Sequence, residues 1–187
     1  MLFALGRSDE ALACYDEAVL LRPTKDEAWN GRANVLYNLE RYEEAIASYG
    51  KVLALRPNCV DVLENRGNAL GKLQRYREAI NSYTKALVHS PERVSTVYYR
   101  GVAYAHLGRH RKAIDDFNLV VDLEPDHYDC RYNRSTCYAQ IGDAERAVED
   151  LKFAIAKHPE VYLEMARVDA DFKKIRARSD FQALIGE

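Results

Sequence analysis

Five prolines divide the 187-residue chain at one constant interval, at Pro23, Pro57, Pro91, Pro125 and Pro159. A fixed period in the range of about 20 to 50 residues, where this interval falls, is typical of an array of small structural repeats. The period gives a partial repeat, four full repeats and a tail, at 1–25, 26–59, 60–93, 94–127, 128–161 and 162–187. This spacing excludes most enzyme folds, because these are built around a single core.

Between the prolines, residues recur in columns that indicate α-helices. An alanine stands at the same distance before every proline, at Ala11, Ala45, Ala79, Ala113 and Ala147. Four residues later a large side chain follows, at Tyr15, Tyr49, Tyr83, Phe117 and Leu151. A spacing of four places both columns on one helical face, and the unbroken alanine column predicts that two helices approach closely there.

A second set of columns lies in the first half of each full repeat. A small residue stands at Ala33, Gly67, Gly101 and Ser135, and a large one follows three residues later at Leu36, Leu70, Tyr104 and Tyr138. Gly108 and Gly142 lie between the two halves, where glycine can supply a left-handed helix end. Each proline then ends the second half. Each repeat is therefore predicted to be helix, turn, helix, turn, and to gain stability from stacked neighbours.

These columns resemble the tetratricopeptide repeat (TPR) family. In the repeat 26–59, the family's Trp, small residue, Leu, Ala, aromatic residue and Pro fall at Trp29, Ala33, Leu36, Ala45, Tyr49 and Pro57. The resemblance covers residues 1–161. It implies an all-α fold, a right-handed α-solenoid (TPR superhelix) of antiparallel helix pairs, as in bacterial-type arrays with a C-terminal capping helix. Arg131 stands in the column of Trp29, which suggests looser packing at that position.

Composition limits the classes of partner. The 27 Lys and Arg balance 29 Asp and Glu, and they are interspersed, whereas nucleic-acid or anionic-membrane binding needs a concentrated basic face. No apolar stretch approaches the roughly 18 residues that a membrane span needs. The four cysteines form no CxxC pair, which fits a reducing compartment. We expect a cytoplasmic protein that binds neither nucleic acid nor membranes.

Catalytic motifs are absent from the sequence. It contains no GxGxxG, GxxxxGK[ST] or HExxH motif. His127, Cys130 and Cys137 offer three zinc ligands, but their spacing matches no zinc pattern and a fourth ligand is missing. Cys137 falls in a buried helix column, which favours a packing role over a nucleophilic one. We expect no enzyme activity, no cofactor and no metal.

An arginine column is the most unusual feature of the first helices. Arg32, Arg66, Arg100 and Arg134 recur at the same interval as the prolines. Such a ladder could bind phosphate or carboxylate groups. The alternative is pairing inside the repeat, since Asp116 and Asp150 follow Arg100 and Arg134 at one fixed offset, and Ser48 and Ser82 take that place for the other two arginines. We favour structural pairing for Arg100 and Arg134, and the function of the whole column stays open.

The resemblance implies that partners bind on the concave surface, which is formed by the first helices. The exposed positions of those helices give a candidate peptide-binding groove of Asn30, Asn34, Glu64, Asn65, Asn68, Tyr98, Tyr99, Tyr132 and Asn133. An Asn side chain offers a donor and an acceptor, so a row of them can bind the backbone of an extended peptide whatever its sequence. Tyrosines add apolar area. The row resembles the asparagine ladder of O-linked N-acetylglucosamine transferases.

The function that these features favour is a protein-protein interaction scaffold or adaptor, which holds an extended partner peptide in the groove. The alternative is a substrate-recruiting TPR region of a larger enzyme, such as an O-linked glycosyltransferase, whose catalytic part lies outside this chain. A co-chaperone clamp is not expected, because the positions that hold a C-terminal carboxylate in that subfamily carry no cation here.

The two ends of the array differ. The partial repeat begins part-way into its first helix, so Leu2 and Phe3 suggest a fragment and an exposed edge that could self-associate. In the tail, Met165, Val168 and Phe172 keep apolar columns, whereas Asp169 replaces the small residue and prevents a further repeat from stacking. Phe181 and Leu184 are expected to fold back, so we predict that 162–187 forms capping helices.

Overall fold

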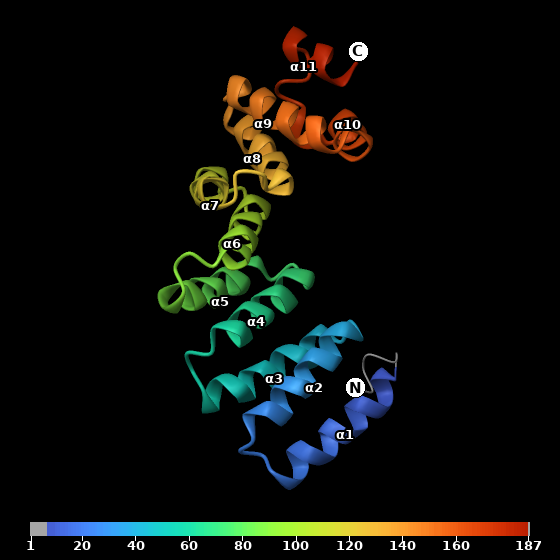
Figure 1. Cartoon of the computed structure of the whole chain (residues 1–187), viewed down its shortest axis with the longest axis vertical. Helices are drawn as coiled ribbons and strands as arrows, with labels where there is room; N and C mark the ends of the chain where they lie inside the picture. The colour runs from blue at the N-terminus through green and yellow to red at the C-terminus, as the bar shows by residue number, and fades with distance from the viewer. Residues whose placement is uncertain (1–6, 187) are drawn as a thin grey trace. The chain divides into compact units, whose positions relative to one another are not determined.

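The computed structural model describes residues 7–186, and all regular secondary structure in that range is helical (Figure 1). The helices are α1 Ser8–Leu21, α2 Asp26–Asn38, α3 Tyr42–Leu55, α4 Val60–Lys72, α5 Tyr76–His89, α6 Val94–His106, α7 His110–Leu123, α8 Tyr128–Ile141, α9 Ala144–Lys157, α10 Pro159–Val168, the 3₁₀ helix η2 Ala170–Phe172 and α11 Ser179–Ile185. The predicted all-α fold is confirmed. No helix in this range is both long and apolar enough to cross a membrane.

Helices pack as the repeat pattern predicts. Within a repeat, α2 packs on α3, α4 on α5, and α8 on α9. Between repeats, α3 packs on α4 and α7 on α8, so in both units helices that follow one another along the chain lie side by side. The result is an α-solenoid of helix pairs, in which each pair covers the face of its neighbour.

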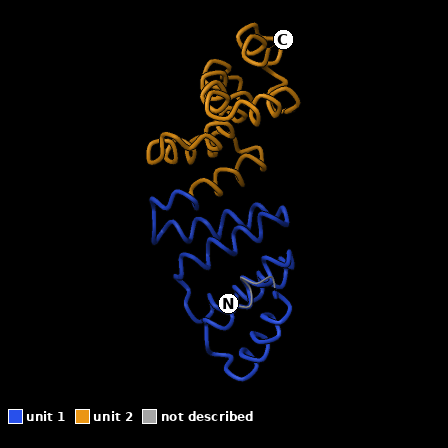
Figure 2. Tube along the Cα trace, turned by 45° about the vertical axis from the view of Figure 1, so that its right-hand side comes forward, with its two compact units in different colours: residues 1–96 blue, residues 97–187 orange. Residues whose placement is uncertain are grey.

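The chain divides into two compact units, which Figure 2 colours separately. Unit 1 comprises residues 1–96 and unit 2 residues 97–187, and the boundary falls within α6. Each unit has its own packed interior.

The alanine column lies where helices meet most closely. Ala45, Ala79, Ala113 and Ala147 are completely buried. In unit 1, a Cβ added to Gly67 would lie 2.4 Å from Cε1 of Tyr83, and in unit 2 one added to Gly101 would lie 2.7 Å from Cε1 of Phe117. The glycines therefore make room for the aromatic ring of the same repeat, and this interlocking holds the two helices of a repeat together.

Two of the turns between the helices of a repeat use glycine as expected. Gly108 and Gly142 have φ of 68° and 86°, in the left-handed region. Glu40 and Gln74 take the same conformation at φ of 59° and 57° without being glycine. The left-handed conformation at this turn is thus imposed by the packing of the two helices. Residues other than glycine adopt it although it costs them more energy.

The expectation of looser packing at Arg131 is wrong. Its guanidinium lies over the ring of Phe153, 4.1 Å from the centroid. Its Nε donates to the carbonyl oxygen of Pro125 at 3.2 Å, just as Nε1 of Trp29 donates to that of Pro23 at 2.8 Å. Arginine replaces tryptophan here because both side chains combine a flat apolar surface with an N–H donor.

The C-terminal segment packs on the last repeat with part of the expected apolar face. Phe172 and Phe181 are completely buried, as expected, and so is Ile185. Met165 and Val168 are 42% and 82% exposed, so their predicted role in the apolar column is wrong. The reason is that α10 ends at Val168 and only the short η2 and the seven-residue α11 follow, so Met165 and Val168 have no full second helix to pack against within residues 7–186.

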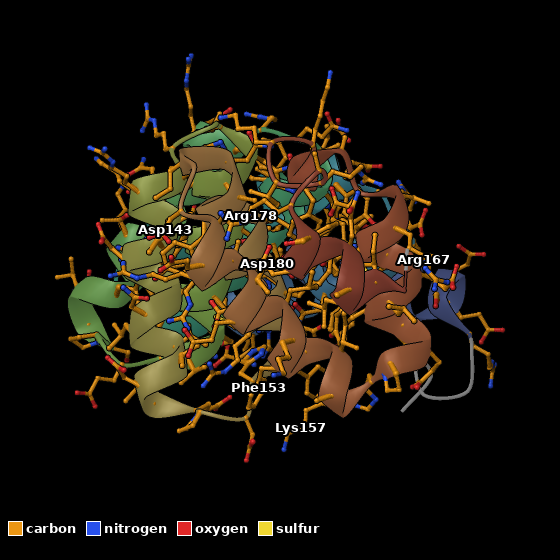
Figure 3. All side chains as sticks on the ribbon, turned by 90° about the horizontal axis from the view of Figure 1, so that it is seen from above. Asp143, Phe153, Lys157, Arg167, Arg178 and Asp180 are labelled. Carbon is orange, nitrogen blue, oxygen red and sulfur yellow. The ribbon has the colours of Figure 1, made fainter. Side chains whose placement is uncertain are left out.

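Polar contacts hold the C-terminal segment in place. The Arg167 guanidinium donates to the carbonyl oxygen of Ile185 at 2.8 and 3.0 Å, which ties α10 to the end of α11. Arg178 and Asp180, side by side in Figure 3, form a two-pronged ion pair at the start of α11. Leu2 and Phe3 lie outside the described residues, so the expected N-terminal edge stays a prediction.

Candidate functional site

The arginine column is held by pairing between helices. Arg100 makes two hydrogen bonds to Asp116, at 2.6 and 2.9 Å, and Arg134 makes two to Asp150, at 2.6 and 2.8 Å. The structural interpretation is therefore confirmed for these two arginines. In unit 1, Arg32 and Arg66 donate to the expected serines, Ser48 at 2.7 Å and Ser82 at 3.1 Å.

Two arginines of the column also contact the preceding repeat. Nε of Arg32 lies 2.6 Å from Oδ1 of Asp16, and Nη1 of Arg134 lies 2.8 Å from Oδ1 of Asn118. Both partners belong to the second helix of the preceding repeat. Arg32 and Arg134 thus lie between the second helix of their own repeat and that of the preceding one, which places their guanidiniums in the packing between repeats.

One column of the candidate groove consists of Asn30, Glu64, Tyr98 and Tyr132, and the last three contact the segment that follows their own repeat. Glu64 is 8% exposed and accepts hydrogen bonds from Arg93, Ser95 and Thr96. Tyr132 is 4% exposed, stacks on Tyr162 and donates to Asp169 at 2.8 Å.

The other two members of that column behave differently from each other. The Tyr98 hydroxyl accepts from Nδ2 of Asn133 at 2.8 Å, so these two candidate residues contact each other in unit 2. Asn30 carries a buried Oδ1 that accepts no hydrogen bond from any described residue. Tyr99 is 43% exposed and forms an edge-on contact with Tyr98.

A second column, Asn34 and Asn68, has a fixed orientation. The buried Tyr49 donates its hydroxyl to Oδ1 of Asn34 at 2.7 Å, and Tyr83 donates to Oδ1 of Asn68 at 2.8 Å. Burial raises the pKa of Tyr49, so its hydroxyl remains protonated and able to donate. Each amide therefore directs its carbonyl oxygen towards the second helix of its repeat and leaves its NH₂ group for another partner.

These two amides line a large pocket of unit 1, which has a volume of about 720 Å³. The lining residues come from α1, α2, α3 and α4 and are Ala11, Cys14, Tyr15, Gly31, Asn34, Val35, Tyr37, Asn38, Tyr49, Asn65 and Asn68. None of them carries a charge at neutral pH. The structure thus brings together three of the predicted groove residues, Asn34, Asn65 and Asn68, and surrounds them with aromatic and aliphatic side chains.

Sequence reasoning missed the contribution of α1 to this pocket. The ring of Tyr15 lies directly over Gly31, where an added Cβ would be 2.3 Å from the ring. Gly31 interrupts the asparagine row in the sequence, and this close approach explains why a side chain is not accommodated there. No column signalled this contact, since Gly31 stands in the column of Asn65, Tyr99 and Asn133, where the other repeats carry larger residues.

Unit 2 has a smaller pocket, of about 270 Å³, where the predicted groove residue Asn133 lies. Its lining also includes His106, His110, Thr136, Cys137 and Asp171. Nδ1 of His110 is buried and has no hydrogen-bond partner among the described residues. Despite the two histidines, residues 7–186 hold no group of three His, Cys, Asp or Glu side chains that could bind a metal ion.

The cysteines fall into two classes of accessibility. Burial raises the pKa of the Cys130 and Cys137 thiols to about 12. Cys14 is exposed at the pocket of unit 1 and Cys59 is half-buried. The two buried thiols therefore stay protonated far above neutral pH, and the packing role predicted for Cys137 agrees with its 1% exposure.

This difference predicts selective alkylation of the folded protein. At about pH 8, a maleimide should modify Cys14 rapidly and Cys59 more slowly, because only thiolate at an accessible sulfur reacts. Cys130 and Cys137 should react only after unfolding in urea. Mass spectrometry of proteolytic peptides over time measures the four rates, and modification of Cys137 as fast as Cys14 would contradict the described packing.

Solved structures share this fold. A tetratricopeptide repeat protein from Parabacteroides merdae superposes with a TM-score of 0.83 at 20% identity, over 100% of this chain and 75% of that one. MamA superposes with a TM-score of 0.81 at 20% identity, over 85% of this chain and 93% of that one. YrrB, described as a TPR protein with an unusual peptide-binding site, has a TM-score of 0.81 at 27% identity, over 89% and 87%.

Family models identify the same repeats in the sequence. Models of the tetratricopeptide repeat match residues 26–59 and 64–128, and a TPR repeat model matches residues 1–40. No match was found among curated proteins. Together these segments cover residues 1–59 and 64–128, which contain the first four prolines of the period. The chain belongs to the tetratricopeptide repeat family.

Proposed function

We propose that this protein is an interaction scaffold that binds an extended segment of a partner protein in the pocket of unit 1. The observation that carries the proposal is the pair of oriented amides, Asn34 and Asn68, on neighbouring first helices. Their free NH₂ groups can donate to the main-chain carbonyls of a bound peptide, with Asn65 between them in sequence. The pocket volume suits a short segment rather than a folded domain.

Other members of the predicted groove support the site indirectly. Glu64 binds Arg93, Ser95 and Thr96, so we assign it the role of holding α4 and the start of α6 together. We assign Tyr132 a similar role towards the C-terminal segment. Asn30 remains a candidate for a further contact in unit 1, and Tyr98, Tyr99 and Asn133 remain candidates for peptide contacts within unit 2. YrrB, which is described as having a peptide-binding site, supports a peptide ligand for this chain by its similarity.

A footprint on Cys14 tests the location. In the Cys59→Ser variant, Cys14 is the accessible thiol among the described residues, and it lines the pocket. A library of capped, unstructured peptides is screened for members that slow maleimide labelling of Cys14. We expect protecting peptides to be found, because a ligand on Asn34 and Asn68 covers the α1 wall of the pocket. If no peptide slows the labelling, the pocket is not a peptide site.

The role of the amides is tested by replacement with aspartate. Asn34→Asp and Asn68→Asp keep an oxygen that accepts from Tyr49 and Tyr83 but replace the NH₂ donor by a second oxygen. The double variant should bind a protecting peptide about tenfold more weakly or worse, since it loses two hydrogen bonds. The Asn58→Asp, Asn81→Asp double variant adds the same two charges at exposed positions of unit 1 outside the pocket lining. It is the matched control and should change the affinity little.

A further inference from the structure

The two fixed amides of the pocket present their N–H donors. The carbonyl oxygens of Asn34 and Asn68 point to tyrosine hydroxyls on the second helices of their repeats. Neither Nδ2 atom donates to a residue among 7–186, so the groups that these asparagines present to a ligand are N–H donors. They require carbonyl oxygens from the ligand and make no use of its main-chain N–H groups. A residue without an N–H is therefore tolerated opposite these positions, and proline is that residue.

The two donors suit a ligand that runs from one repeat to the next. Asn34 and Asn68 occupy the same position in successive repeats, on α2 and α4, and both line the pocket. A peptide that accepts from both amides therefore presents two separate main-chain carbonyls on one side. A polyproline II helix has three residues per turn and no internal hydrogen bonds, so every third carbonyl points the same way and is available to accept.

An ordinary extended strand suits the two amides less well. Each of its residues carries a main-chain N–H group that also needs a partner, and the carbonyl oxygens of Asn34 and Asn68 point away to tyrosine hydroxyls. A proline-rich segment in the polyproline II conformation has few N–H groups to satisfy and keeps its carbonyls available.

The remaining lining of the pocket suits the same ligand. Tyr15 and Tyr37 are only half-buried and contribute aromatic surface to the pocket. Aromatic-lined grooves are the common way in which proline-rich segments are recognised, because proline rings pack on flat aromatic faces. None of the lining residues is charged, so a charged ligand side chain would lose its hydration there without gaining an ion pair.

We infer that the pocket of unit 1 binds an uncharged, proline-rich segment of a partner in the polyproline II conformation. The inference rests on the proposed function of the same pocket and names the class of its ligand. Proline-rich segments bind with little loss of chain entropy, since their bound conformation is already populated in solution. Successive carbonyls on one face of the segment accept from Asn34 and Asn68, while its rings lie among the tyrosines.

Three capped peptides of equal length test the inference: repeated Ala-Pro-Pro, repeated Ala-Ser-Gly and repeated Glu-Pro-Pro. They are titrated against the Cys59→Ser protein by calorimetry and by protection of Cys14 from maleimide. We expect the Ala-Pro-Pro peptide to bind about tenfold more tightly than either of the others. Its affinity should fall about tenfold in the Asn34→Asp, Asn68→Asp double variant and change little in the Asn58→Asp, Asn81→Asp double variant, whose exposed positions lie outside the pocket lining.

The outcomes separate this inference from the proposed function. If Ala-Ser-Gly protects Cys14 as well as or better than Ala-Pro-Pro, the polyproline II inference is overturned but peptide binding stands. If Glu-Pro-Pro binds best, the argument from the uncharged lining is wrong. If none of the three peptides protects Cys14, the inference fails, and the peptide library then decides whether the pocket binds peptides at all. Circular dichroism of each variant shows that the helices are intact.

Discussion

Replacing Asp150 by alanine should destabilise the protein by about 3–5 kcal/mol, the typical cost of removing one partner of a buried ion pair. Asp150 is 3% exposed, and its carboxylate accepts from both Arg134 and Arg131. Without it, two guanidiniums that are 13% and 19% exposed lose their counter-charge. Urea unfolding followed by circular dichroism measures the change in the free energy of unfolding.

The control for this prediction is an exposed carboxylate in the same unit. Asp126 is 84% exposed and pairs with Lys157 at 3.0 Å. Asp126→Ala should change the free energy of unfolding by less than about 0.5 kcal/mol, because solvent screens the pair. Equal effects of the two substitutions would show that the buried position of Asp150 does not matter, contrary to the packing described above.

A second large effect is expected at Gly67, on the helix face that contacts Tyr83. A methyl group there would lie 2.4 Å from Cε1 of Tyr83, a side chain that is 3% exposed and bonded to Asn68. Because the ring cannot move freely, Gly67→Ala should destabilise unit 1 by about 1–3 kcal/mol in spite of the better helix propensity of alanine. Trp29, the single tryptophan of the chain, reports the unfolding of unit 1 by fluorescence.

Gly50 provides the matched control for Gly67. It also lies inside a helix, α3, but nothing lies within 4 Å of an added Cβ. Gly50→Ala should therefore stabilise the protein by about 0.5–1 kcal/mol, since alanine restricts the unfolded chain and favours the helix. The opposite signs distinguish packing from propensity. If both substitutions stabilise, the close contact of Gly67 with Tyr83 is not present in solution.

The repeat columns predicted the helix pairs because packing in such an array is local. Ala45 and Tyr49 are buried just as Ala79 and Tyr83 are one repeat later, so their spacing carries the fold. The same logic failed at Met165 and Val168. The apolar column continues through these residues, but no neighbouring helix covers them, so both are exposed. A column indicates which face of a helix can be buried, and only the neighbouring helices decide whether it is.

The candidate site shows the same limit. The positions of Asn34, Asn65 and Asn68 followed from the period, and they lie in one pocket. The sequence could not separate them from Glu64 and Tyr132, which occupy equally regular positions but are used by Arg93 and Asp169. These contacts join residues that are far apart in the sequence, and the partner side chains do not recur from repeat to repeat. The columns therefore do not predict them.

By itself, the sequence determined that this protein is a stack of helix pairs, because a constant period with small and large residues in fixed columns leaves one way to bury them. Only the tertiary structure decided which polar side-chain groups remain available to bind a ligand. The amides of Asn34 and Asn68 are oriented by Tyr49 and Tyr83, each on the other helix of the repeat. Hydrogen bonds are directional, so the chemistry of the pocket depends on the placement of these partners.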